Sequence, residues 1–404
     1  MENFLLSLLL LLFLSRLLGI LAQRVGIHPL IGEVLGGLIL SPLILDLVVI
    51  TTPLDVFSQF AIIMVMLYSG LTTEYKSYTA HRGESILIAV GGVVVSFLLI
   101  YYVTRFLLGF SQITSLFMGA ILSNTAIEVS AGVLRKSGED DVTSVVMGAS
   151  FADDVLAVVV LGIVTSLALS PGEGLSEVEG VKVLLITLAK VLIFLAATFF
   201  ILSKALPRIF DRFLKGSEKV LFTITFLLTF LLAILARYVE LHEVIGAYLA
   251  GLILARWRSH PDPMLKRTVY WGRINETTEN MITALFSPIF FGYMGILLGD
   301  ELNGISLGGP AFSRFIIVII VIASMAVVGK LFGCGIVAYL TGFTKRDSVK
   351  IGGVMVGRGA LELVLISYGF SRGFLDPVQS AAVITVTLLT VFIAPLLYTR
   401  FTRE

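Results

Sequence analysis

Residues 28–41 of this chain read HPLIGEVLGGLILS, and residues 242–255 read HEVIGAYLAGLILA. Both stretches open on a histidine, carry glycine at their fifth and tenth positions and share the run GLIL. Likeness at this separation predicts an internal repeat of a whole structural unit. The alternative explanation is composition alone, because membrane helices rich in glycine and leucine resemble one another.

The composition of the whole chain predicts a membrane protein. Hydrophobic residues make up 57% of the 404 residues, charged residues 14%, and the mean hydropathy is +0.99. A soluble domain needs more charge to cover its surface. The net charge of +1 indicates no nucleic-acid partner, and the single cysteine, Cys334, excludes an intramolecular disulfide. The sequence contains no phosphate-binding loop, so an ATP-driven pump is not predicted. It also contains no His/Cys spacing typical of a metal site and no soluble-enzyme motif.

Thirteen stretches are apolar enough to predict spanning helices, which need about 20 such residues. The first is read as a retained span, not a signal peptide, because no basic segment precedes it and no cleavage site follows. The predicted spans are 3–22, 29–45, 57–72, 84–108, 112–135, 141–167, 182–205, 217–237, 242–257, 276–299, 312–340, 345–370 and 376–399. No polar stretch is long enough to predict a separate soluble or regulatory domain.

The distribution of lysine and arginine predicts the orientation of these spans. With an odd number of crossings, twenty basic residues fall on one side and five on the other. The loop 170–181 on the poorer side carries three glutamates and no basic residue. Because basic residues favour the cytoplasm, we expect the N-terminus outside and the C-terminus inside an inner or plasma membrane.

The two quoted stretches fall in the second and ninth spans, seven crossings apart. A fainter likeness links Phe57-Ser58 to Phe286-Ser287 at the same separation. Since seven is odd, the second copy enters the membrane inverted. The sequence therefore predicts two inverted six-helix repeats, with 182–205 as the connecting helix, and such repeats are typical of secondary transporters.

Two predicted spans that correspond within the repeat contain polar residues and glycines at mid-depth. Residues 122–132 read LSNTAIEVSAG, and residues 352–362 read GGVMVGRGALE. Such segments predict interrupted helices, whose free backbone groups must line a cavity. Close packing of small residues is the alternative. It accounts for the glycines but not for Glu128, Arg358 and Glu362.

Asp153 and Asp154 lie near the middle of the apolar span 141–167. Charged groups at this depth are rare and usually functional. Two neighbouring carboxylates in a low dielectric cannot both ionise cheaply, so one is expected to take up a proton near neutral pH. Their hard oxygens also suit a dehydrated Na⁺ or Li⁺. One site would thus hold either a cation or protons. The alternative is a structural pair.

Lys330 is a second intramembrane charge, in the span 312–340. A buried lysine needs a carboxylate to stay charged, and we expect Asp153 to supply it. Protonation of Asp153 or arrival of a cation would break the pair, so Lys330 is predicted to compensate charge. A purely structural ion pair is the alternative.

The remaining intramembrane charges form a secondary group. Arg358 and Glu362 lie four residues apart on one helix face, and Glu128 lies on the opposing interrupted helix. We expect these three to stabilise the fold, with direct ion binding as the alternative. Further charges and histidines are assigned interfacial, capping or undecided roles: Arg16, Lys190, Glu33, His28 and His242.

At Asp153-Asp154 the sequence resembles the monovalent cation/proton antiporter superfamily, and within it the sodium/proton antiporters of the NapA type. The resemblance covers nearly the whole chain. It implies the NhaA/NapA-like fold, a homodimer, and an elevator-type movement of a core domain against a dimerisation domain. The core would comprise 84–167 and 312–400, and the dimerisation domain 1–72 and 217–299.

The same resemblance implies roles for single residues. Asp154 would be the essential cation and proton carboxylate, Asp153 would pair with Lys330, and Thr125 would line the site. It also implies electrogenic exchange and a part in pH homeostasis, with no cofactor. Arg358 departs from this pattern, because it resembles the arginine of the electroneutral branch.

That branch pairs its arginine with a glutamate where this chain has Ala149. Glu128 or Glu362 is the hypothesised replacement.

Other functions remain open at this stage. Potassium/proton exchange is the nearest alternative, and a membrane ion sensor that binds without transporting is another. A channel would need a filter of carbonyl-rich loops, which the sequence does not contain. An intramembrane aspartyl protease would need its two aspartates on separate helices, whereas these are adjacent.

Overall fold

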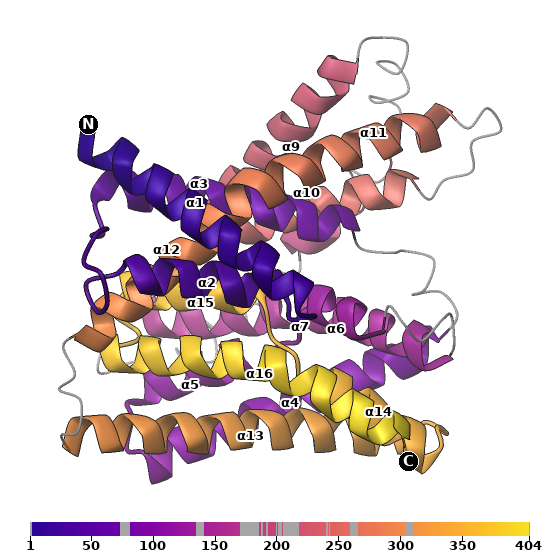
Figure 1. Cartoon of the computed structure of the whole chain (residues 1–404). Helices are drawn as coiled ribbons and strands as arrows, with labels where there is room; N and C mark the ends of the chain where they lie inside the picture. Colours follow the sequence, from indigo (N-terminus) through magenta and orange to yellow (C-terminus); the bar gives the residue numbers. More distant parts are fainter. Residues whose placement is uncertain are drawn as a thin grey trace. The chain divides into compact units, whose positions relative to one another are not determined.

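The computed structural model describes residues 2–72, 81–134, 141–169, 218–239, 241, 243–258, 266–303 and 310–403, with isolated positions between 186 and 204. These residues form α-helices and short π-helical turns, and the described part contains no strand (Figure 1). They fall into two compact units. The first unit comprises residues 1–56, 77–164 and 288–404, and the second comprises 57–76 and 165–287.

The first unit contains most of the helices. They are α1 (Glu2–Arg24), α2 (Pro29–Leu40), α4 (Arg82–Tyr102) with the π-turn η2 (Val103–Leu107), α5 (Gln112–Leu122), α6 (Ile127–Leu134), most of α7 (Asp141–Leu169), α12 (Ser287–Asn303), α13 (Pro310–Leu340), α14 (Lys345–Val354), α15 (Ala360–Ser371) and α16 (Pro377–Arg403). Within this unit α13 packs along α4, and α16 contacts both α14 and α15.

The second unit contains most of α3 (Thr52–Thr72), α9 (Glu218–Tyr238), α10 (Glu243–Arg258), α11 (Lys266–Met281) and the π-turn η3 (Ile282–Phe286). Within it α10 packs against α9, and Phe60 lies edge-on to Phe286 with ring centroids 5.5 Å apart.

Within the described residues, eight helices are long and apolar enough to cross a membrane. They correspond to the predicted spans 3–22, 57–72, 84–108, 141–167, 217–237, 276–299, 312–340 and 376–399. The apolar helices α2, α5 and α15 are shorter. Most of 182–205 lies outside the described residues, as does His242. The count of thirteen spans and the inverted repeat therefore remain predictions.

Local sequence signals set the helix ends. Ser111 caps α5 by accepting a hydrogen bond from Thr114 N at 3.1 Å, and Thr344 caps α14 in the same way at Asp347 N. Gly342 adopts a positive φ of 107°, which lets the chain turn sharply between α13 and α14.

The prediction of a continuous span over 29–45 is wrong at its end, because α2 stops at Leu40. Ser41 is in an extended conformation, and its hydroxyl donates to Leu38 O at 2.6 Å, which ends the helix.

Both predicted interruptions are present. The first break, residues 123–126, separates α5 from α6, and the second, residues 355–359, separates α14 from α15. The two breaks touch, since Ala126 N donates to Gly357 O at 2.9 Å. Each break thus satisfies part of the backbone that the other leaves free.

Candidate functional site

The candidate site is built on α7, which carries the two adjacent aspartates. Asp153 is completely buried and Asp154 is 4% exposed. Successive helical positions point about 100° apart, so the two carboxylates face different neighbours. Both aspartates thus lie in the protein interior, and their binding of cations and protons stays a prediction.

Asp153 faces α13. Lys330 Nζ donates to its Oδ1 at 2.8 Å and to its Oδ2 at 2.7 Å, and both side chains are fully buried. The pairing expected from sequence is therefore present, across 177 residues of chain. Excellent geometry of this kind is what a buried ion pair needs to offset the loss of hydration of both charges.

Glycines let α13, the helix that carries Lys330, pack closely on α4. Gly329 and Gly333 flank Lys330 on α13, and both face α4. A Cβ built on Gly333 would lie 2.8 Å from Gly91 O, and one built on Gly329 would lie 2.7 Å from Ser96 Cα. The absence of side chains at these positions therefore lets the backbones of α4 and α13 approach closely.

Asp154 faces the first break. Asn124 is completely buried and its Nδ2 donates to Asp154 Oδ1 at 3.4 Å. Thr125 donates its hydroxyl to Met355 O at 2.7 Å and lies within hydrogen-bonding reach of Asp153. The break between α5 and α6 is thus held by the second break while it contacts both aspartates.

Asn124 is a site residue that the sequence analysis did not single out. The signal available was an amide in an apolar stretch, directly before Thr125.

Arg358 lies in the second break and is fully buried. Its guanidinium donates to Leu122 O through Nε at 3.1 Å and again through Nη2, to Val356 O at 2.9 Å and to Ala326 O at 3.2 Å. Leu122 is the last residue of α5, so the cation lies where the helix dipole is negative. This geometry agrees with the stabilising role expected of Arg358.

The two glutamates predicted to accompany Arg358 differ in what the structure describes. Glu362 accepts a hydrogen bond from Gly359 N at 2.7 Å through Oε2, and so caps α15. Glu128 belongs to α6, but its side chain lies outside the described part of the chain.

The structure also describes the charged residues and the histidine that were given interfacial, capping or undecided roles. Arg16, expected at the interface, lies 3.8 Å from the buried carboxylate of Glu33. His28 accepts a hydrogen bond from Leu30 N at 3.4 Å, which is the capping role expected for it. Lys190 is exposed.

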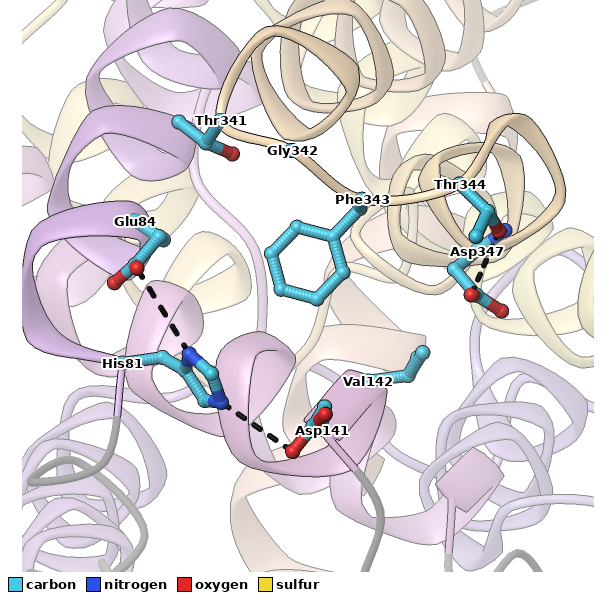
Figure 2. A pocket seen from close by; sticks show the side chains of 9 residues that line it. All are labelled: His81, Glu84, Asp141, Val142, Thr341, Gly342, Phe343, Thr344 and Asp347. Atoms are coloured by element: carbon cyan, nitrogen blue, oxygen red, sulfur yellow. Dashed lines mark hydrogen bonds and ion pairs between the residues drawn. The ribbon is translucent and has the colours of Figure 1, made fainter.

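A separate cavity of about 480 Å³ lies where α4, α7 and α14 begin. Figure 2 shows the His81 ring between Glu84 and Asp141, with Phe343 facing it. His81 Nε2 is 3.4 Å from Asp141 Oδ1, and Nδ1 is 3.9 Å from Glu84 Oε1. Asp141 is twelve residues before Asp153, or about 18 Å along α7. This cavity is therefore distinct from the paired aspartates.

Comparison with known proteins gives consistent matches over almost the entire chain. A family described as "Sodium/hydrogen exchanger, transmembrane" matches residues 9–403. The Na(+)/H(+)-K(+) antiporter GerN of Bacillus cereus is 28% identical over 390 residues, covering 96% of this chain and 93% of that protein. The high-affinity Na(+)/H(+) antiporter NhaS3 of Synechocystis is 26% identical, covering 97% and 88%.

A solved structure shares the fold. The sodium proton antiporter MjNhaP1 from Methanocaldococcus jannaschii superposes with a TM-score of 0.73 at 16% identity, covering 98% of both chains.

Proposed function

This chain belongs to the sodium/hydrogen exchanger family, and from that premise we propose that Asp153 and Asp154 bind Na⁺ or Li⁺ in competition with protons. The family is one of membrane-spanning cation/proton antiporters, which are secondary transporters and not enzymes. The observation that carries the proposal is the pair of buried carboxylates against a helix break, one of them neutralised by Lys330.

The two carboxylates have different roles in this proposal. Asp154 is the carboxylate that takes either the cation or a proton, since it faces the polar break, where the neutral Asn124 donates to it. Asp153 keeps Lys330 charged while it is ionised and releases it when it binds a proton or a cation. Because one site cannot hold both ions, each ion leaves before the other binds, which couples their movement.

We further propose that exchange is electrogenic, with more protons than cations moved per cycle. Release of Lys330 provides a second titrating group beside Asp154, which supports this stoichiometry. The proposal also includes a homodimer in which the core moves in the manner of an elevator against a dimerisation domain. The core comprises 84–167 and 312–400, and the dimerisation domain comprises 1–72 and 217–299. In the proposed orientation, the N-terminus lies outside and the C-terminus lies in the cytoplasm.

Two alternatives compete with sodium selectivity. Potassium/proton exchange is supported by the name of GerN, which includes potassium as well as sodium. A sensor that binds cations without moving them would use the same buried carboxylates. Flux measurements with each ion separate all three.

The test uses purified protein in liposomes that contain a pH-sensitive dye and a preset pH gradient. Na⁺, Li⁺ or K⁺ is added outside, with the membrane potential either clamped or free. The wild type is compared with Asp154→Asn and with Asp141→Asn, a matched change of an exposed carboxylate at the start of the same helix. We expect proton movement with Na⁺ or Li⁺ in the wild type and Asp141→Asn, and none in Asp154→Asn.

Each result has a defined meaning. Dependence of the rate on the potential clamp supports electrogenic exchange, and independence contradicts it. A response to K⁺ as strong as that to Na⁺ favours the alternative selectivity. No response to any ion in folded wild-type protein overturns the exchange proposal.

A further inference from the structure

Asn124 has one feature that its packing does not explain. Its side chain is completely buried, and its Oδ1 has no hydrogen-bond partner within the described part of the chain. An unsatisfied carbonyl oxygen in a protein interior is costly, and most such groups are hydrogen-bonded. An orphan oxygen therefore needs an explanation such as a ligand.

The position of this oxygen indicates what the ligand is. Nδ2 of the same amide donates to Asp154 Oδ1, so the terminal atoms of Asn124 lie beside that carboxylate. The orientation of the amide is consistent, because an ionised carboxylate accepts hydrogen bonds and cannot donate to Oδ1. The unpartnered oxygen and the carboxylate thus lie close together in the buried interior, beside the first break.

Neutral amide oxygens and carboxylates are the hard ligands that small monovalent cations accept when they lose water. We infer that Asn124 Oδ1 is a direct ligand of the transported cation, next to Asp154. The inference rests on the proposed cation/proton exchange and adds to it a neutral ligand. Such a neutral ligand matters because it binds the cation without adding further negative charge to the two carboxylates.

The same amide also serves the protonated state. When Asp154 carries a proton, its hydroxyl can donate to Asn124 Oδ1. When the carboxylate is ionised, Nδ2 can donate to it, and this is the contact that the structure shows. Asn124 therefore offers each form of Asp154 a suitable partner, and cation and proton compete for one oxygen as well as for the carboxylate.

The experiment replaces the amide by a side chain of similar size without an oxygen, Asn124→Leu. Its matched control is Ser115→Ala on α5, which removes another buried polar atom that has no hydrogen-bond partner among the described residues. Cation binding is measured as the rise in melting temperature in detergent when NaCl or LiCl replaces choline chloride at constant ionic strength. Transport is measured in liposomes as the apparent KM for each cation.

We expect Asn124→Leu to raise the apparent KM for Na⁺ and Li⁺ about tenfold and to reduce the cation-induced rise in melting temperature. Ser115→Ala should match the wild type in both. A purely positioning role would lower the maximal rate without changing the order of preference among Na⁺, Li⁺ and K⁺. A change in that order is therefore the distinguishing signature of a ligand.

Other outcomes would overturn the assignment of Asn124 as a ligand or separate it from the exchange proposal. Unchanged KM and unchanged cation stabilisation in folded Asn124→Leu overturn the inference while exchange itself stands. If the wild type is stabilised by Na⁺ but moves no protons, exchange fails, and loss of that stabilisation in Asn124→Leu still supports the ligand. Should Asn124→Leu not fold, Asn124→Ala, which also lacks a side-chain oxygen, decides: a raised KM supports the inference and an unchanged KM overturns it.

Discussion

Lys330 is a buried cation whose charge is balanced by one carboxylate, Asp153. Removing one member of such a pair leaves an uncompensated charge in the interior, which costs about 3–5 kcal/mol. We therefore expect Asp153→Asn to destabilise the protein by that amount, and the double variant Asp153→Asn/Lys330→Met to recover most of it. Chemical unfolding in detergent micelles, followed by tryptophan fluorescence, measures both.

The control for this pair is Lys350→Met, which removes a partly exposed cation 3.1 Å from Asp347. Such pairs contribute at most about 1 kcal/mol. If Asp153→Asn is no less stable than Lys350→Met, Lys330 does not depend on Asp153 for its charge. Recovery in the double variant without recovery of transport would separate the structural role of the pair from its role in coupling.

Arg358 stabilises the two breaks through backbone carbonyls. Its donors reach Leu122 O, Val356 O and Ala326 O, so Arg358→Ala leaves three buried acceptors without this donor. A buried carbonyl that loses its only donor costs about 1–3 kcal/mol, but Ala326 O lies inside α13, where it also accepts the helical hydrogen bond. We expect a severe loss of stability in Arg358→Ala and a smaller loss in Arg358→Lys, which keeps the charge but not the planar set of donors.

Thermal unfolding and size-exclusion chromatography in detergent measure this loss. Adding Glu128→Gln to Arg358→Ala provides the decisive comparison. If the double variant folds again, the main partner of Arg358 is the carboxylate of Glu128 and not the backbone carbonyls. Normal stability of Arg358→Ala would contradict both interpretations.

At the scale of helices, the close contact of α4 with α13 sets the position of Lys330. We expect Gly333→Ala to destabilise the protein by about 1–3 kcal/mol and to slow transport, because its Cβ would lie 2.8 Å from Gly91 O and push the helices apart. Gly83→Ala on α4 is the control, since a Cβ there meets nothing within 4 Å and alanine favours the helix. Equal effects on unfolding and proton flux would contradict the role of this contact.

Several features of the helices could be predicted from the sequence. Long apolar runs predict spans such as α4 and α13, because a membrane span requires continuous hydrophobicity. The breaks were predictable because polar residues and glycines interrupt such runs. The Lys330–Asp153 pair was predictable for a related reason: intramembrane charges are rare, so few partners were available to each.

Other contacts leave no comparable pattern in the sequence. Arg358 binds carbonyls, and every residue has a carbonyl, so its partners could not be identified by residue type. The orphan oxygen of Asn124 depends on how two breaks meet across the fold, not on local spacing. The early end of α2 at Leu40 depends on a side-chain bond of Ser41 within a stretch that remains apolar.

At the scale of the whole molecule, the candidate site belongs to a single unit. Asp153, Asp154, Lys330, Asn124 and Arg358 all lie in the unit formed by residues 1–56, 77–164 and 288–404. Two segments distant in sequence contribute to the site: residues 77–164 provide the carboxylates and the neutral oxygen, and residues 288–404 provide the two cations. All five residues also lie within the proposed core (84–167 and 312–400), so the proposed elevator-type movement would carry the site intact.

The orientation of that unit is testable because the native chain has one cysteine, Cys334, which is fully buried. Arg314 lies near the start of α13, and Arg346 lies just beyond its end; both are exposed. With the N-terminus outside, Arg314 faces the exterior and Arg346 the cytoplasm. A membrane-impermeant maleimide should label Arg314→Cys in intact cells and label Arg346→Cys only after permeabilisation.

The wild type, with Cys334 alone, is the control and should stay unlabelled in both conditions. The reverse pattern would invert the predicted topology and, with it, the side from which protons drive exchange. Labelling of both variants in intact cells would mean that α13 does not cross the membrane. Because α13 carries Lys330, that result would also remove the premise that the Lys330–Asp153 pair lies within the bilayer.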